Sequence, residues 1–178
     1  MAADWSGMES ALKDFFEELK GDDDPSFMQI GSKIAGEYAA AISQASDGVG
    51  HGVTAVPGES GVASAFANEF KNQMADAAPS FASVITAVGT CNKTLVLAYG
   101  SGDSSVSMVS STVNVVTNGG TGNANEYKSA FAMSEDMTAA KSAELITKAM
   151  KNHFSGNATL LTGVTSAPSP VTSTLSLS

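Results

Sequence analysis

Four segments of this chain carry apolar residues at spacings of three and four, and this periodicity is the strongest constraint on its fold. Such spacing places the apolar residues on one face of a helix, so each segment is predicted to be an amphipathic helix with a buried stripe. The stripes are Trp5, Met8, Leu12, Phe15 and Leu19; Phe27, Ile30, Ile34, Tyr38 and Ala41; Val62, Phe66, Phe70 and Met74; and Ala139, Ala143, Ile146, Met150 and Phe154.

The boundaries of these helices follow from capping and breaking residues. Gly21 is expected to end the first helix, and Asp24 with Pro25 to open the second. Residues 47–61 form a predicted loop. Residues 80–88 are either a short helix, which we favour, or the approach to a strand. Ser134 is expected to cap the last helix. Gly31 and Gly36 weaken the second helix but allow another backbone to approach closely.

Two central segments favour extended structure. The sequence TLVLAYG at 94–100 is short, apolar and bounded by turn residues, which predicts a buried strand. Residues 105–118 are rich in valine with partial alternation, and a change of phase near Met108 indicates a bulge. Residues 118–123 are expected to form a turn or loop. CNKTLVLAYG and GNATLLTGV both follow helical regions, which indicates either a faint internal repeat or chance similarity.

The last segment, residues 156–178, has no charged side chain and contains Pro168 and Pro170. Val171, Leu175 and Leu177 share one phase of an alternating pattern, which is typical of a strand. The segment is either an arm that adds a strand to another subunit's sheet or a disordered terminus. The predicted fold is therefore α+β: a mainly helical domain at 1–155, with a small antiparallel β element, and an extended C-terminal arm at 156–178.

Composition narrows the classes of function. The 178 residues carry a net charge of −9, only 15% are charged, and all nine basic residues are lysines. An acidic chain without arginine is not expected to bind nucleic acid directly. The low charge content favours either a surface covered by neighbouring subunits or a biased composition. No sequence stretch predicts a secretory signal or a membrane span, so we expect a soluble protein made in the cytoplasm.

No group of residues makes a supported catalytic or metal-binding pattern. Ser104 lies in GDSS, which is similar to the nucleophile block of one esterase family, but His153 lacks the aspartate three residues earlier that this family carries. His51 lies between glycines without further histidine ligands nearby. The acidic run at 22–24 lacks the spacing of a calcium loop. Cys91, the only cysteine, cannot form an internal disulfide. We therefore expect no enzyme activity, cofactor, metal or small-molecule ligand.

The segments IGSKIAGEYAAAISQA, GVASAFANEFKNQM and AMKNHFSGNATLLTGVTSAPSPV carry a resemblance. Short alanine-rich helices, followed by a glycine–valine stretch and a proline-rich end, resemble the small virion structural proteins of tailed bacteriophages, from the tail, neck or baseplate region. The resemblance implies a chain that packs in many copies against itself and other virion proteins. The residues expected to contact these partners are Trp5, Phe15, Val171, Leu175 and Leu177.

Two other classes of function remain open on the sequence alone. One is a small soluble protein-binding module or effector that acts as a monomer and binds its partner through the first helix. The other is a hydrolase that uses Ser104 or His51. A stable monomer with an ordered C-terminal segment favours the binding module, and loss of a hydrolytic activity on Ser104→Ala favours the hydrolase.

Overall fold

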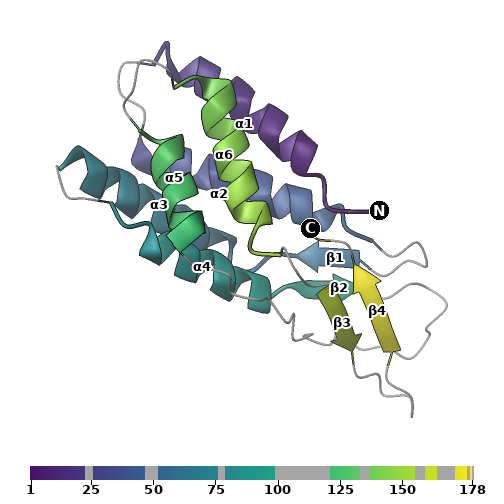
Figure 1. Cartoon of the computed structure of the whole chain (residues 1–178). Coiled ribbons are helices and arrows are strands. Elements are labelled where there is room, and N and C mark those ends of the chain that lie inside the picture. The colour runs from purple at the N-terminus through teal and green to yellow at the C-terminus, as the bar shows by residue number, and fades with distance from the viewer. Residues whose placement is uncertain are drawn as a thin grey trace.

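The computed structural model of the chain describes residues 1–22, 26–46, 52–75, 79–98, 121–132, 137–154, 159–163, 171–175 and 177. Helices dominate these residues, which confirms the helix-rich part of the predicted fold (Figure 1). The elements are α1 (Trp5–Leu19), α2 (Phe27–Ser43), β1 (Gly52–Ala55), α3 (Glu59–Met74), α4 (Ala82–Lys93), β2 (Val96–Ala98), α5 (Thr121–Ala130), α6 (Ala139–Lys151), β3 (Thr159–Gly163) and β4 (Val171–Leu175).

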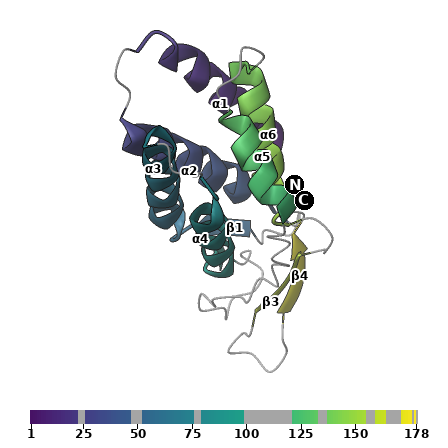
Figure 2. The ribbon, with the colours of Figure 1, turned by 60° about the vertical axis from the view of Figure 1, so that its left-hand side comes forward.

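The helices pack in neighbouring pairs. α2 lies against α3, α1 lies along α6, and α5 packs beside α6 (Figures 1 and 2). The α2–α3 contact is close because Gly31 faces the backbone of α3: a Cβ placed on Gly31 would lie 2.3 Å from the carbonyl oxygen of Ala63. The predicted close approach is therefore confirmed at Gly31. At Gly36 the nearest atom is a side-chain oxygen of Glu59 at 3.6 Å, which is an ordinary contact.

A cluster of aromatic rings joins α3, α4 and α5. Phe66 and Phe70 on α3 contact Tyr127 and Phe131 edge to face, and Phe81 stacks on both Tyr127 and Phe131 at 5.7 and 5.8 Å between ring centroids. Each such pair adds about 0.5–1.5 kcal/mol beyond the burial of its surface. Phe81 is fully buried and adopts a left-handed backbone conformation at the start of α4. The ring packing thus holds a conformation that a phenylalanine rarely adopts.

The four predicted stripes face the core for most of their length, but two of the predicted caps are wrong. α2 begins after Ser26, whose backbone N–H donates to Gln29 Oε1 at 3.1 Å, rather than at Asp24 and Pro25. α6 begins after Thr138, whose hydroxyl accepts from the backbone N–H of Lys141, rather than at Ser134. In both cases a nearer hydroxyl residue provides the cap.

Three further predictions need correction. The predicted loop at 47–61 contains β1, and α3 starts at Glu59 inside it. The short helix expected at 80–88 is α4, which continues to Lys93. The predicted turn at 118–123 overlaps the start of α5, a helix that periodicity does not indicate. α5 is ordered by packing instead, because Tyr127 and Ala130 are buried and Glu126 pairs with Lys148 of α6 at 2.9 Å.

The strands form two separate antiparallel pairs, and no sheet of more than two strands occurs among the described residues. β1 pairs with β2, so part of the strand predicted at 94–100 is present. β3 pairs with β4 over five residues, from Thr159 opposite Leu175 to Gly163 opposite Val171. This β3–β4 ribbon extends away from the helices (Figures 1 and 2). The valine-rich segment at 105–118 lies outside the described residues.

Candidate functional site

Trp5 and Leu177, two of the predicted partner-binding residues, lie together inside this chain. Trp5 is the first residue of α1, and its indole ring packs against Tyr38 of α2 and Phe154, with ring centroids 6.0 and 5.9 Å apart. Its Nε1–H donates a buried hydrogen bond to the carbonyl oxygen of Leu177 at 3.1 Å. We call the buried rings of Trp5, Tyr38 and Phe154 the tryptophan socket.

Leu177 lies at the tryptophan socket through this hydrogen bond and is itself buried. Leu177 is 1% exposed, Trp5 is 8% exposed, and both belong to the buried apolar core. The chain therefore leaves the core at Phe154, forms the β3–β4 ribbon and returns to the core at Leu177. Both ends of this excursion lie at the same tryptophan ring.

The other three predicted partner-binding residues lie apart from the socket. Phe15 is half-buried on α1 and contacts Phe16, with ring centroids 5.7 Å apart. Val171 and Leu175 are the first and last residues of β4, where they pair with Gly163 and Thr159. The structure thus joins two of the five predicted residues in one site, places two on the ribbon and leaves Phe15 on the helical surface.

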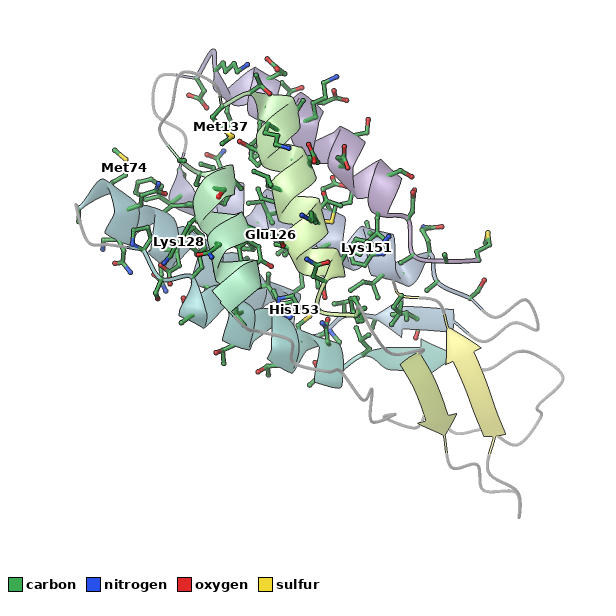
Figure 3. All side chains as sticks on the ribbon, in the orientation of Figure 1. Met74, Glu126, Lys128, Met137, Lys151 and His153 are labelled. Atoms are coloured by element: carbon green, nitrogen blue, oxygen red, sulfur yellow. The ribbon has the colours of Figure 1, made fainter. Side chains whose placement is uncertain are left out.

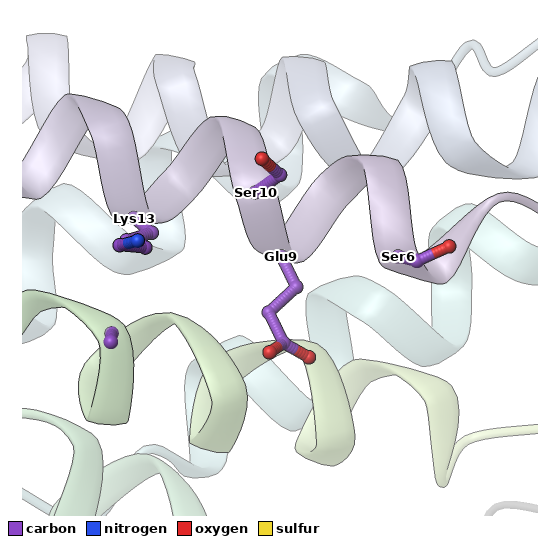
Figure 4. A pocket seen from close by; sticks show the side chains of 5 residues that line it. Ser6, Glu9, Ser10 and Lys13 are labelled. Atoms are coloured by element: carbon purple, nitrogen blue, oxygen red, sulfur yellow. The ribbon is translucent and has the colours of Figure 1, made fainter.

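A polar groove runs between α1 and α6. Figure 4 shows Ser6, Glu9, Ser10 and Lys13 along α1, with the Glu9 carboxylate reaching toward α6. Ala140 completes the lining on the α6 side. The side chains that line the groove include one carboxylate, one ammonium group and two hydroxyl groups. The groove therefore offers both donors and acceptors of hydrogen bonds.

An apolar groove of about 210 Å³ opens where α1 and α3 end and α2 begins. Met74 projects there from the last turn of α3 and is 69% exposed (Figure 3). Gln73 bridges to α5 by donating from Nε2 to the carbonyl oxygen of Phe131 at 2.7 Å. The apolar lining residues are Phe16, Leu19, Phe27, Ile30, Phe70, Met74 and Phe131. A groove with this lining suits an apolar side chain of a partner.

The interior holds polar groups that the sequence patterns do not reveal. The Tyr38 hydroxyl donates a hydrogen bond to Asn92 Oδ1, and burial raises the pKa of Tyr38 well above its ordinary value. Burial likewise raises the pKa of the Cys91 thiol to about 11, which makes it a poor nucleophile. The Tyr127 hydroxyl and Asn92 Nδ2 have no hydrogen-bond partner among the described residues.

His153 is buried just beyond the last turn of α6 (Figure 3). Burial lowers the pKa of His153 to about 4, because the charged imidazolium is disfavoured away from water. Neither ring nitrogen has a hydrogen-bond partner among the described residues. His153 and the other buried polar groups are not among the residues that line the polar groove or the apolar groove.

Ser104 and His51, the residues of the alternative hydrolase hypothesis, lie outside the described residues, as do Asp23 and Asp24 of the acidic run. Within the part of the chain that the structure describes, no three histidine, cysteine, aspartate or glutamate side chains gather as a metal site would require. None of the described helices combines the length and apolar character needed to cross a membrane.

Comparisons with protein-family models, with curated proteins and with solved structures found no match to this chain. Sequence patterns indicated both Trp5 and Leu177 as contact residues but not that they contact each other. A buried indole usually needs a hydrogen-bond acceptor for its N–H. From the sequence, this requirement alone indicates that Trp5 donates a hydrogen bond to an oxygen atom.

Proposed function

We propose that this chain is a structural component of a tailed-phage virion, in the tail, neck or baseplate, where copies pack against one another and against other virion proteins. The observation that carries the proposal is the β3–β4 ribbon, which extends from the helical body and has no third strand among the described residues. A two-stranded ribbon is at best marginally stable in water, and a third strand or a packing surface is needed to stabilise it.

The chemistry of the ribbon supports pairing with a neighbour. Each strand of an isolated pair presents one edge of backbone groups that can accept another strand. Soluble proteins often protect such edges with lysine or other charges, but residues 156–178 carry no charged side chain. Burying this segment in an interface therefore desolvates no charge. In this proposal the small antiparallel β element is completed by neighbouring subunits in the virion.

The same proposal includes Phe15, Val171 and Leu175 as contacts with other virion proteins, while Trp5 and Leu177 act through the tryptophan socket. The partners are proteins rather than nucleic acid, because the chain has a net charge of −9 and no arginine. The proposal needs no enzyme activity, cofactor, membrane or small-molecule ligand.

Quantitative mass spectrometry of density-gradient-purified particles tests this function. We expect the chain to co-purify with a major structural protein at a fixed ratio, and the ratio gives the symmetry of its ring or shell. A chain that is abundant in the lysate but absent from the particles contradicts the proposal. Particles lacking residues 168–178 of this chain provide a second test, since weakened incorporation with an intact helical body is expected.

The apolar groove favours one alternative function, a small protein-binding module that acts as a monomer. Met74 and the rings around it would then receive an apolar segment of the partner. Met74→Glu distinguishes the two functions. The binding module is favoured over the structural role by two results together. The unmodified chain binds a partner but is not found in particles, and Met74→Glu abolishes that binding.

A further inference from the structure

We propose that the tryptophan socket of one copy receives the Leu177 segment of a neighbouring copy, so that copies of this chain are joined by exchanged arms. This inference rests on the proposed structural function, because it identifies the partner of the arm as a second copy of the same chain. The contact seen within one chain, Trp5 with Leu177, is then repeated between chains.

The tryptophan socket recognises its occupant by two features. The Trp5 Nε1–H supplies one directed donor for a backbone carbonyl oxygen, and Leu177, which carries that oxygen, is 1% exposed as part of the buried apolar core. Neither feature depends on which copy provides the segment. Exchange of an identical element between copies replaces each contact with an equivalent one, and for this reason it is a low-cost route to association.

The arm is long enough to reach another copy. Phe154 and Leu177 both lie at Trp5, and the 22 residues from 155 to 176 separate them. Fully extended, these residues span about 70 Å at about 3.3 Å each. A globular chain of this length has a radius of gyration of about 16 Å, hence a diameter of about 40 Å. An opened ribbon therefore reaches beyond the body that carries it to a socket on an adjacent body.

Local concentration decides which copy occupies the socket. In dilute solution the tethered Leu177 segment competes at an effective concentration of about millimolar, so the socket takes the segment of its own chain. In a ring or shell, neighbouring arms are held at similar local concentrations, and the exchanged arrangement is no longer suppressed. The β3–β4 pairing is recovered when strands from two copies meet in the same register.

The experiment uses the fact that Trp5 is the only tryptophan in the chain. Full-length Leu177→Asp keeps an intact socket but carries an arm that cannot dock, since docking would bury a carboxylate. Full-length Trp5→Phe keeps an intact arm, has no tryptophan emission and holds its own arm less tightly, by about fivefold, because the hydrogen bond is lost. In a mixture, tryptophan emission reports only on Leu177→Asp sockets filled by Trp5→Phe arms.

We expect Leu177→Asp alone to emit at longer wavelength than the unmodified chain. Addition of Trp5→Phe at several hundred micromolar should return the emission to shorter wavelength, with a heterodimer seen by light scattering. The double variant Trp5→Phe with Leu177→Asp is the matched control and should produce neither change. Circular dichroism establishes beforehand that each variant keeps the helical content of the unmodified chain.

A synthetic peptide of residues 170–178 separates the two ways in which the mixture could fail. If the peptide restores the emission but Trp5→Phe does not, the socket accepts a separate segment but the tethered arm of another copy does not reach it, and the exchange is overturned. If neither restores it, the socket does not bind the segment in trans and the exchange is overturned as well. Either result leaves the virion role standing if the chain is found in particles. Heterodimers of a chain absent from particles support the exchange and contradict the virion role.

Discussion

The helical body and the C-terminal ribbon are held in place by different means. The body buries side chains from each of its six described helices, including the stacked rings around Phe81, and ties α5 to α6 through Glu126. In the arm the structure describes a five-residue backbone ladder between β3 and β4 and the buried residue Leu177. The body therefore specifies its own packing, whereas the ribbon offers backbone groups that any strand in the correct register can use.

The α2–α3 contact gives the largest expected effect in the body. Gly31→Ala places a methyl group 2.3 Å from the Ala63 carbonyl oxygen, and a backbone atom cannot move aside without separating the two helices. We expect a loss of about 3 kcal/mol in the free energy of unfolding, measured by chemical denaturation. Such a loss shows that packing within the body determines the stability of the whole chain.

Gly36→Ala is the matched control on the same helix. Its new methyl group would lie 3.6 Å from Glu59 Oε1, and alanine is a better helix former than glycine by up to about 1 kcal/mol. We expect this variant to be as stable as the unmodified chain or slightly more stable. Equal losses from Gly31→Ala and Gly36→Ala contradict the assignment of the close approach to Gly31.

The second prediction concerns His153, at the junction of body and arm. Its pKa falls from 6.5 to about 4 on folding, so the unfolded chain binds the proton first as the pH drops. The free energy of unfolding is then unaffected by this group above about pH 7, decreases through the range from 6.5 to 4, and is lower by about 3 kcal/mol below that range.

His153→Met removes this titration while keeping an apolar side chain in the core. The measurement is the free energy of unfolding at pH 7 and pH 4 for both proteins. We expect the unmodified chain to lose about 3 kcal/mol more than the variant between these two values. Parallel pH profiles indicate that the imidazole reaches water in the folded state, and that the junction belongs with the arm rather than the body.

The sequence predicted the body better than the arm because periodicity records which face of a helix is buried. The stripes through Leu12, Ile34, Phe66 and Ile146 lie in the core as expected. α5 escaped prediction because its start is rich in glycine and asparagine, and tertiary packing of Tyr127 orders it despite that local sequence.

The arm was predictable only as far as its local pattern reaches. Alternation around Val171 and Leu175 predicted a strand, and β4 confirms it. The partner of that strand depends on a residue far along the chain or on another chain, and alternation does not encode this choice. The Trp5–Leu177 contact spans 172 positions, a separation at which no spacing rule applies.

Two buried tyrosines of the body allow a third prediction, with a smaller expected change in the free energy of unfolding. Tyr38→Phe removes the hydroxyl that donates to Asn92 and leaves Asn92 with neither Oδ1 nor Nδ2 paired among the described residues. We expect a loss of about 2 kcal/mol in the free energy of unfolding, the cost of unpaired buried polar atoms. Tyr127→Phe is the matched control, because its hydroxyl has no described partner, and it should cost nothing measurable. A larger loss of stability for Tyr127→Phe than for Tyr38→Phe contradicts the stabilising role of the Tyr38–Asn92 hydrogen bond.

The smallest expected effect on the free energy of unfolding is in the arm. This effect is the most direct test of the difference between the helical body and the arm. Leu177→Ala and Leu12→Ala remove the same atoms from two buried sites, one on the arm and one on α1. Leu12 is fixed in the helical body, so its loss should cost about 3 kcal/mol in the free energy of unfolding. Leu177 can detach while the helices stay folded, so its loss can cost no more than the free energy of docking the arm, and we expect about 1 kcal/mol.

Hydrogen exchange should show the β3–β4 amides losing protection in Leu177→Ala while the helical amides keep theirs. If the two leucines cost the same and the helices lose protection together with the ribbon, the arm is an integral part of the body, and it is not free to pair with a neighbour.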